Sequence, residues 1–284
     1  MIDDVIFSNE RELEEIKKSI SNKSVDNFHV VADFDRTLTK AFVEGEKFHS
    51  IIAILRDGSY LTNDYTKKAH ALFDKYHPIE IDTEISIDHK KREMKNWWIE
   101  HADLLVKSGL NKKDVENVAN SKKIKFREGA LEFIDFLYKN SIPLVIISSG
   151  GLGGDAIAMC LEREGTMQDN IYLVANSYEW NKNGYAVKIN EPIITSVNKD
   201  ETMIRNFPFF KIIENRKNIL LIGDSLEDVN MVNGFDYDNL IKIGFLNEKV
   251  EKNLNLYKKN YDIVILNDGS MKHVNELLGS LFNI

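Results

Sequence analysis

The sequence has very little cysteine and no long apolar run. Its single cysteine, Cys160, rules out an internal disulfide framework and cannot form a thiolate metal site by itself. No apolar stretch approaches the roughly 18–20 residues that span a bilayer. The chain starts MIDDVIFSNERELEEI, which is acidic and lacks the basic-then-apolar layout of a signal peptide. We therefore expect a soluble, cytoplasmic protein with no membrane partner.

Positive charge is also in short supply. The chain has 37 Lys and Arg against 45 Asp and Glu, a formal net charge of −8. Because nucleic acids are held by clustered Lys and Arg, this balance argues against a nucleic-acid partner. With 284 residues, 43% of them hydrophobic, the chain suits one large α/β domain with an insertion, or two domains.

Polar residues follow three short apolar runs that predict buried β-strands. The runs are 28–33, which leads into Asp33-Phe34-Asp35; 143–151, which ends in Ser148, Ser149 and two glycines; and 218–230, which contains Gly223, Asp224 and Asp228. The stretches between them can form helices, so the order is β-α-β, as in a parallel sheet. Ligands bind such sheets at the carboxyl ends of the strands, where we expect these polar groups to meet. The alternative is three unrelated strand ends that carry Asp and Ser by chance.

The chain between the first and second of these strands is longer than a crossover needs. About 85 residues separate Phe42 from Phe126, where a minimal β-α-β unit takes about 30. Apolar residues near 3.6 spacing predict helices over 62–76 and 86–109, and 111–121 reads as a third. We expect residues 43–125 to form a helical cap domain over the crevice. Residues 1–42 and 126–284 would then form the α/β core.

Local signals predict further elements of this core. Helices are expected over 8–20, with Ser8 as N-cap, and over 127–141, 154–165 and 271–282. Asn183-Gly184 lies between two strand-like runs and indicates a hairpin, and 262–266 reads as the last strand.

The polar residues at the strand ends suit the hydrolysis of a phosphate monoester. Its dianion repels nucleophiles, so a site must offer an attacking group, a cation, hydrogen-bond donors and a proton. Asp33 could attack to give an aspartyl-phosphate, while Asp35 protonates the leaving oxygen and then activates water. Asp224, with Asp228 one helical turn on, would complete an oxygen-ligand site suited to Mg²⁺.

The phosphate itself would be held by other groups. Ser148 and main-chain N–H groups at the Gly-rich helix start can bind its oxygens. Lys199 would neutralise the phosphate and the nucleophile. Each residue alone has an ordinary structural explanation, since Lys199 could be a surface lysine and Asp224 a helix cap.

Together these residues resemble the haloacid dehalogenase (HAD) superfamily of aspartate-nucleophile phosphatases. The four motifs of that superfamily are matched by Asp33, Asp35 and Thr37; by Ser148; by Lys199; and by Gly223, Asp224 and Asp228. The resemblance implies a Rossmann-like α/β core with a parallel sheet and an inserted helical cap of the C1 type. It implies that Mg²⁺ is bound by the Asp33 side chain, the Asp35 carbonyl and Asp224, and that Asp228 supports these ligands without binding the metal directly. The implied phosphate-binding residues are Thr37, Ser148, Ser149, Gly150 and Lys199.

Longer segments are similar to the cytosolic pyrimidine 5′-nucleotidase family (cytosolic 5′-nucleotidase III). They cover most of the chain after about residue 25 and include HPIEID (77–82), KNWWIEH (95–101) and IKIGFLNEKVEKNL (241–254). The similarity implies a phosphoric monoester hydrolase, an Mg²⁺-dependent 5′-nucleotidase that favours pyrimidine nucleoside 5′-monophosphates. The cap would recognise the nucleoside, and the candidate residues are Glu80, Trp97, Trp98 and His101.

Several alternatives stay open at this point. Met94, Trp98, His101 and Leu105 form a helical stripe that could pack the core of the cap instead of touching substrate. Ala102 stands where the family tends to carry a histidine, which leaves the base preference open. The chain could act on another phosphomonoester, such as a sugar phosphate or phosphoserine, or transfer phosphate to a nucleoside. It could also be a non-catalytic binding protein with a HAD fold.

Overall fold

A seven-stranded sheet forms the centre of the molecule. The computed structural model describes residues 4–82, 84–199, 204–205 and 207–282. The strand order is β1-β11-β10-β9-β2-β5-β6, and every neighbouring pair is parallel except β1 with β11. The strands are β1 Val5–Phe7, β2 Phe28–Ala32, β5 Leu144–Ser148, β6 Ile171–Ala175, β9 Asn218–Gly223, β10 Asn239–Leu246 and β11 Ile263–Leu266. The predicted α/β fold with a parallel sheet is confirmed.

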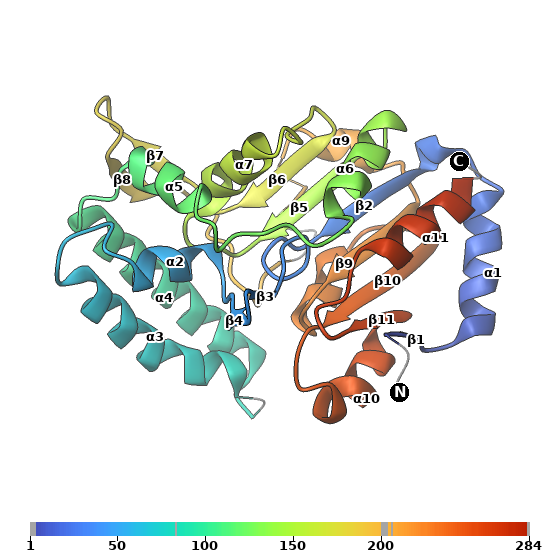
Figure 1. The fold of residues 1–284 in the computed structure, drawn as a ribbon, viewed down its shortest axis with the longest axis horizontal. Coiled ribbons are helices and arrows are strands. Elements are labelled where there is room, and N and C mark those ends of the chain that lie inside the picture. Colours follow the sequence, from blue (N-terminus) through green and yellow to red (C-terminus); the bar gives the residue numbers. More distant parts are fainter. Residues whose placement is uncertain (1–3, 83, 200–203, 206, 283–284) are drawn as a thin grey trace.

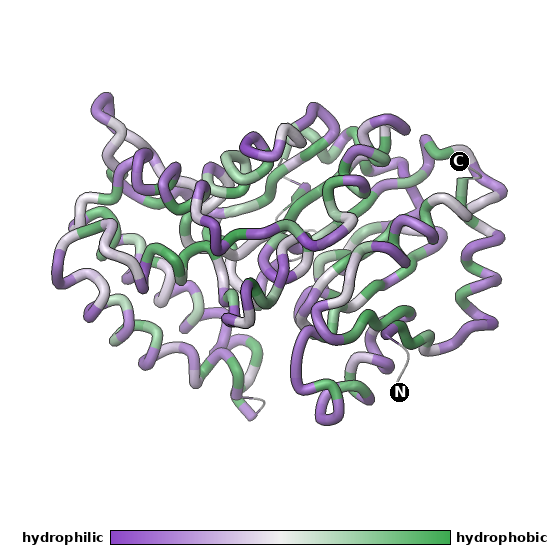
Figure 2. The backbone as a smooth tube through the Cα atoms, viewed as in Figure 1, coloured by the Kyte–Doolittle hydropathy of each residue, from purple (hydrophilic) through white to green (hydrophobic). Residues whose placement is uncertain are grey.

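The central strands are mostly apolar because helices cover both faces of the sheet. Every residue of β2, β5 and β9 is buried, which is why these runs lack the polar alternation of a half-exposed strand. Figure 2 shows the strands as hydrophobic segments, whereas the outer helix α1 (Glu10–Ser21) is mostly hydrophilic.

Helices follow the strands and pack on the sheet (Figure 1). Those of the core are α1, α6 Ala130–Lys139, α7 Gly153–Arg163, α9 Phe210–Ile213, α10 Val250–Asn260 and α11 Lys272–Phe282, with 3-10 turns at Val25–Asn27 and Glu227–Val232. None of the helices in the described ranges has the length and apolar character that crossing a bilayer takes.

The long insertion after β2 is helical, as predicted. A short hairpin, β3 Phe42–Val43 and β4 Glu46–Lys47, leads into α2 Ile51–Asp57, α3 Tyr65–Ile81, α4 Ile87–Lys107 and α5 Lys112–Ala119. Helices α3 and α4 lie at the opposite end of the molecule from α1 and α11 (Figure 1). The insertion touches the rest of the chain where α4 packs against β8 (Ala186–Ile189) and α5 against α7. The division into a cap of residues 43–125 and a core remains a prediction.

Some element boundaries differ from the predicted ones for local reasons. The side chain of Asn9, not Ser8, accepts a hydrogen bond from Glu12 N and caps α1. Helix α3 continues through Pro78 to residue 81, five residues beyond its predicted end. The predicted hairpin at Asn183-Gly184 is confirmed as β7 Tyr178–Trp180 and β8 Ala186–Ile189, with Gly184 at φ +80°.

His29, inside β2, gives the fold a measurable sensitivity to acid. Its ring is fully buried, and neither ring nitrogen makes a hydrogen bond of normal geometry to the described residues. Burial lowers the pKa of His29 from 6.5 to about 3, although the main chain of Arg216 opposes this. Below about pH 6.5, His29 binds a proton in the unfolded chain but stays neutral in the folded chain. The free energy of unfolding therefore falls from about pH 6.5 down to about pH 3.

We expect His29→Leu to remove this acid sensitivity. Relative to the variant, the parent chain should lose about 1.4 kcal/mol of unfolding free energy per pH unit between roughly pH 6 and 4. Urea denaturation of both proteins across this range measures the difference. A gap that stays constant with pH would contradict the assignment.

Candidate active site

The three predicted strand ends lie side by side. Strands β9, β2 and β5 are neighbours in the sheet, and all three point the same way. Asp33 follows the last residue of β2, Ser148 ends β5 and Gly223 ends β9. The polar groups therefore gather at one edge of the sheet, as the sequence predicted.

Asp33 is buried in a charged cluster with Lys199. Lys199 Nζ donates to Asp33 Oδ1 at 2.5 Å and to Asp228 Oδ1 at 3.2 Å, and all three residues are at least 93% buried. Burial and the charge of Asp228 raise the pKa of Asp33 to about 6, while Lys199 acts in the opposite direction. Although burial lowers the pKa of Lys199, the charges of Asp228 and Asp33 raise it above its ordinary value, so it stays protonated. The cluster therefore holds a buried carboxyl group beside a fixed cation.

Asp224 adds a third carboxylate to the cluster. Ligand oxygens of Asp33, Asp224 and Asp228 lie within 4.8 Å of one another. Burial, followed by the charges of Asp228 and Asp33, raises the pKa of Asp224 well above its ordinary value. This arrangement is unfavourable for three ionised groups and fits a divalent cation with oxygen ligands.

Asp228 is held more tightly by the protein than Asp224 is. Its Oδ2 accepts from the main-chain N–H groups of Asp224 and Ser225, each at 3.0 Å, and its Oδ1 accepts from Lys199. This approach requires the glycine of the fourth motif, because a Cβ on Gly223 would lie 2.5 Å from Asp228 Cβ. Asp228 therefore shapes the loop that carries Asp224.

Asp35 faces the insertion and the loop after β5. Its Oδ1 accepts from Ile51 N at the start of α2 at 3.3 Å. A Cβ on Gly150 would lie 3.7 Å from Asp35 Oδ2, which places the carboxyl group close to this loop. Burial and the charge of Asp33 raise the pKa of Asp35 to about 7. A carboxyl group that holds a proton near neutral pH can serve as a proton donor.

The loop after β5 forms a compact turn at the edge of the site. Ser148 Oγ accepts from Gly150 N at 3.1 Å. Asn176 Nδ2 donates to the carbonyls of Ser149 and Gly150 at 3.4 Å, and Asn176 also bonds both main-chain groups of Ile194. Thr37, the remaining predicted phosphate ligand, is fully buried, and its hydroxyl has no hydrogen-bond partner in the described part of the chain.

The two tryptophans of the insertion have different surroundings. Trp97 is 92% buried and packs on Tyr76 and Phe73, inside the helical insertion. Trp98 is half-buried and lies on Gly151, where a Cβ would come within 2.5 Å of its ring. The residue on the buried face of the helix is thus Trp97, and Trp98 is the one that lies on the loop after β5.

His101 and Glu80 complete the set of predicted cap residues. His101 is buried, its Nε2 lies 3.0 Å from Tyr65 Oη, and its ring stacks on Trp98. Glu80 Oε1 accepts from Ser196 Oγ at 2.7 Å. The structure therefore places His101 behind Trp98. It places Glu80 between α3 and the segment that leads to Lys199.

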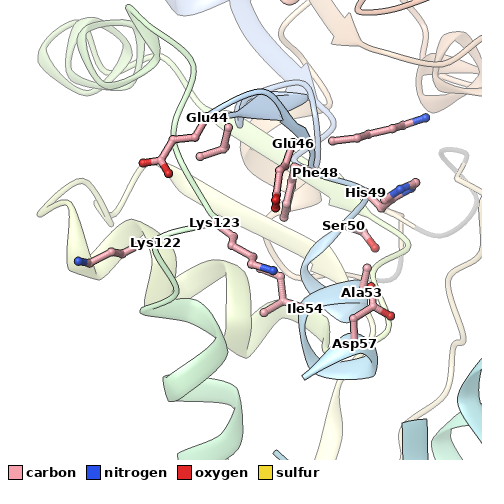
Figure 3. A pocket seen from close by; sticks show the side chains of 12 residues that line it. Glu44, Glu46, Phe48, His49, Ser50, Ala53, Ile54, Asp57, Lys122 and Lys123 are labelled. Atoms are coloured by element: carbon pink, nitrogen blue, oxygen red, sulfur yellow. The ribbon is translucent and has the colours of Figure 1, made fainter. Parts of the chain in front are cut away.

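A cavity of about 290 Å³ lies beside the hairpin β3–β4. The hairpin lines it, together with His49 and Ser50 just before α2, Asp57 at the end of α2, and the pair Lys122 and Lys123 (Figure 3). Its lining includes none of the three clustered carboxylates.

With this geometry established, the chain can be compared with known proteins. The model of the pyrimidine 5′-nucleotidase (UMPH-1) family matches residues 36–282. The chain belongs to this family. It is accordingly a phosphoric monoester hydrolase of the 5′-nucleotidase type, which confirms the predicted family and enzyme class.

Relatives of this nucleotidase extend over nearly its full length. The 7-methylguanosine phosphate-specific 5′-nucleotidases of Mus musculus and Homo sapiens are 33% and 32% identical, over 94% of this chain and 88% of theirs. A crystal structure of cytosolic 5′-nucleotidase IIIB bound to cytidine superposes with a TM-score of 0.91 at 27% identity, covering 98% of this chain and 94% of that one. A substrate-bound phosphoserine phosphatase, at 17% identity and a TM-score of 0.52, shares the HAD fold.

Several residues around the candidate site were not predicted from the sequence. Asn247 and Glu248 follow β10, a strand that was not predicted, and Asn247 Nδ2 donates to Asp224 Oδ2 at 3.3 Å. Glu248 pairs with Arg36 at 2.8 Å and with Lys47 at 2.6 Å. The signal was present, because Asn247 and Glu248 are polar residues directly after an apolar run, as at the other strand ends.

Proposed function

We propose that this chain hydrolyses nucleoside 5′-monophosphates through a phosphoryl group carried on Asp33. The observation that supports this best is the buried pair of Asp33 and Lys199 at the sheet edge, with Trp98 over the adjacent loop. The pair of Asp33 and Lys199 provides a charged site for phosphoryl transfer, and Trp98 provides an aromatic face within reach of a base.

The proposed reaction has two steps. Asp33 attacks phosphorus, a bond forms between its carboxylate oxygen and phosphorus, and the bond from phosphorus to the 5′-oxygen breaks. Asp35 gives its proton to that oxygen, so the nucleoside leaves neutral. Asp35 then takes a proton from water, which attacks phosphorus, releases phosphate and restores the Asp33 carboxylate. Lys199, Ser148, Ser149, Gly150 and Thr37 are proposed to hold the phosphate oxygens.

We further propose Mg²⁺ as the cofactor. The side chains of Asp33 and Asp224 and the carbonyl of Asp35 would hold it, and Asp228 would orient this set. Bound at such a site, Mg²⁺ supplies charge neutralisation for the phosphate oxygens. The raised pKa of Asp224 supports the fit, because a cation relieves the repulsion that causes it.

Metal removal should abolish turnover. We expect EDTA to eliminate phosphate release and added Mg²⁺ to restore it. Independently of activity, Mg²⁺ at about 100 times its Kd should stabilise the fold by about 2.7 kcal/mol. Thermal melts should show this shift for the parent chain but not for Asp224→Asn. Full activity in EDTA, or an equal shift in the variant, would count against the metal site.

The nucleotide preference is proposed at two levels. A nucleoside monophosphate should exceed phosphoserine and ribose 5-phosphate in kcat/KM by at least about tenfold, because only a base can use Trp98. Among bases we favour pyrimidines, and 7-methylguanine is the second candidate because of the named relatives. Measured kcat/KM values for CMP, UMP, GMP and 7-methylguanosine 5′-monophosphate decide between them. Equal values for nucleotides and phosphoserine would refute a nucleotidase.

Trp98→Ala should weaken nucleotide binding selectively. Loss of one base-stacking contact of about 1–3 kcal/mol predicts a KM for nucleotides that is about 5- to 150-fold higher. Trp98→Phe keeps an aromatic face and should retain most of the affinity. Ribose 5-phosphate has no base, so its KM should not change in either variant. An equal rise for both substrates would show that Trp98 only packs the cap.

A further inference from the structure

Arg127, just before α6, is the largest fully buried side chain among the described residues. Its guanidinium donates to main-chain carbonyls on two separate segments. The acceptors are Thr37 O at 2.9 Å, Arg36 O at 2.5 Å and Gly269 O at 2.6 Å, with Thr39 O at 3.4 Å. The guanidinium also lies 3.9 Å from the ring centre of Phe245.

These contacts hold the irregular segment that follows the two catalytic aspartates. Residues 36–41 are neither helix nor strand, and Arg36 has a left-handed φ of +64°. The carbonyls in such a segment need donors from elsewhere. Arg127 supplies three of them from one planar group, and its own N–H donates to Leu38 O at 2.9 Å. A lysine cannot reproduce this fork.

Two neighbours extend the network to both sides of the site. Asp268 pairs with Arg127 at 3.0 Å and accepts from the N–H groups of Ala41 and Phe42, at 2.7 and 3.1 Å. Asn247 Oδ1 accepts from Arg127 at 3.0 Å, and Asn247 Nδ2 donates to Arg36 O and to Asp224 Oδ2. Arg127 is therefore linked to Asp224 by one side chain.

The same segment also sets the place of Asp35. It connects Asp35 to the hairpin β3–β4 and so to α2, whose first N–H, that of Ile51, donates to Asp35. A shift of the segment would move the proton donor relative to the nucleophile. Misplacement by about 1 Å can cost about 100-fold in rate.

We infer that Arg127 is a positioning residue for catalysis, which fixes Asp35 through the 36–41 main chain and Asp224 through Asn247. This rests on the proposed roles of Asp35 and Asp224. Burying a charged side chain costs free energy, and neutral donors could satisfy these loop carbonyls at a lower cost. If Arg127 served stability alone, its conservative replacement would lower the melting temperature and leave kcat unchanged.

The test compares Arg127→Lys with Arg216→Lys. Arg216 also donates to two main-chain carbonyls, Val25 O and Phe28 O, but at the opposite end of β2. Both variants should melt at lower temperature. Only Arg127→Lys should lower kcat, by about 10- to 100-fold, with KM for the nucleotide changed by less than about threefold.

Chemical rescue gives a second readout. In Arg127→Ala, free guanidinium at millimolar concentration should recover part of the lost kcat, while Arg216→Ala should show no such response. If Arg127→Ala does not fold, Asp268→Asn, which keeps the shape but loses the charge, should show the same selective loss of kcat.

The outcomes separate this inference from the proposed reaction. An unchanged kcat in Arg127→Lys, or an equal loss in Arg216→Lys, would overturn the positioning role. Asp33→Asn is measured in parallel. If it retains activity, the proposed reaction itself is wrong, whereas an inactive Asp33→Asn beside a fully active Arg127→Lys refutes only the inference.

Discussion

Asp33→Asn is expected to lower kcat for phosphate release by at least about 10³-fold. An amide has the shape of the carboxylate but cannot attack phosphorus to form an acyl phosphate. The substitution also removes one negative charge next to Lys199, which still pairs with Asp228. The fold should therefore survive, and thermal melting should confirm it. Steady-state assays with a nucleoside monophosphate measure the loss.

Asp262→Asn is the matched control. Asp262 is a half-buried aspartate whose pKa is also raised by burial, but it lies just before β11, away from the carboxyl ends of the strands. Its carboxylate accepts from Lys242 N at 2.7 Å. Activity of this variant should match that of the parent. Comparable losses in both variants would mean that the effect comes from burial of an amide and not from loss of the nucleophile.

Lys199→Met is expected to produce the second largest loss, about 10²- to 10³-fold in kcat/KM. The lysine is the cation that contacts both Asp33 and Asp228, so its removal leaves buried carboxylates without compensation. The variant also lacks a charge to receive the phosphate dianion, and both kcat and KM should worsen. Lys199→Arg keeps the charge but places it differently, so it should recover only part of the activity.

Lys217→Met serves as the control for Lys199. Lys217 pairs with Asp236 at the amino end of β9, whereas the candidate site lies at the carboxyl end of that strand. Its replacement should leave kcat/KM unchanged. Full activity in Lys199→Met would show that the ion pair with Asp33 is structural and would remove the main support for the mechanism.

The sequence predicted the edge of the sheet where the site lies because the signals there are local. Each central strand is a short apolar run buried on both faces, and each ends in Asp, Ser or Gly. Parallel strands in neighbouring positions must bring those ends together. In the structure β9, β2 and β5 are neighbours, so their polar ends do meet.

Other parts depended on contacts between distant residues. Trp97 and Trp98 are adjacent on one helix, and only the packing of Tyr76 and Phe73 decides which of them is buried. In the sequence, Arg127 is one of several basic residues near the start of the predicted helix 127–141. Its partners lie about 90 and 140 positions away in the chain, so no local pattern could reveal them.

The central claim, a phosphoryl group carried on Asp33, can be tested by trapping it. In Asp35→Ala, p-nitrophenyl phosphate can still react, because its leaving group needs no proton, but water can no longer be activated. After acid quench, mass spectrometry of peptides should locate one hydroxylamine-sensitive phosphoryl group on Asp33, formed together with a burst of p-nitrophenol. A phosphoryl group on another residue, or release of phosphate in step with p-nitrophenol from an unmodified protein, would contradict the account.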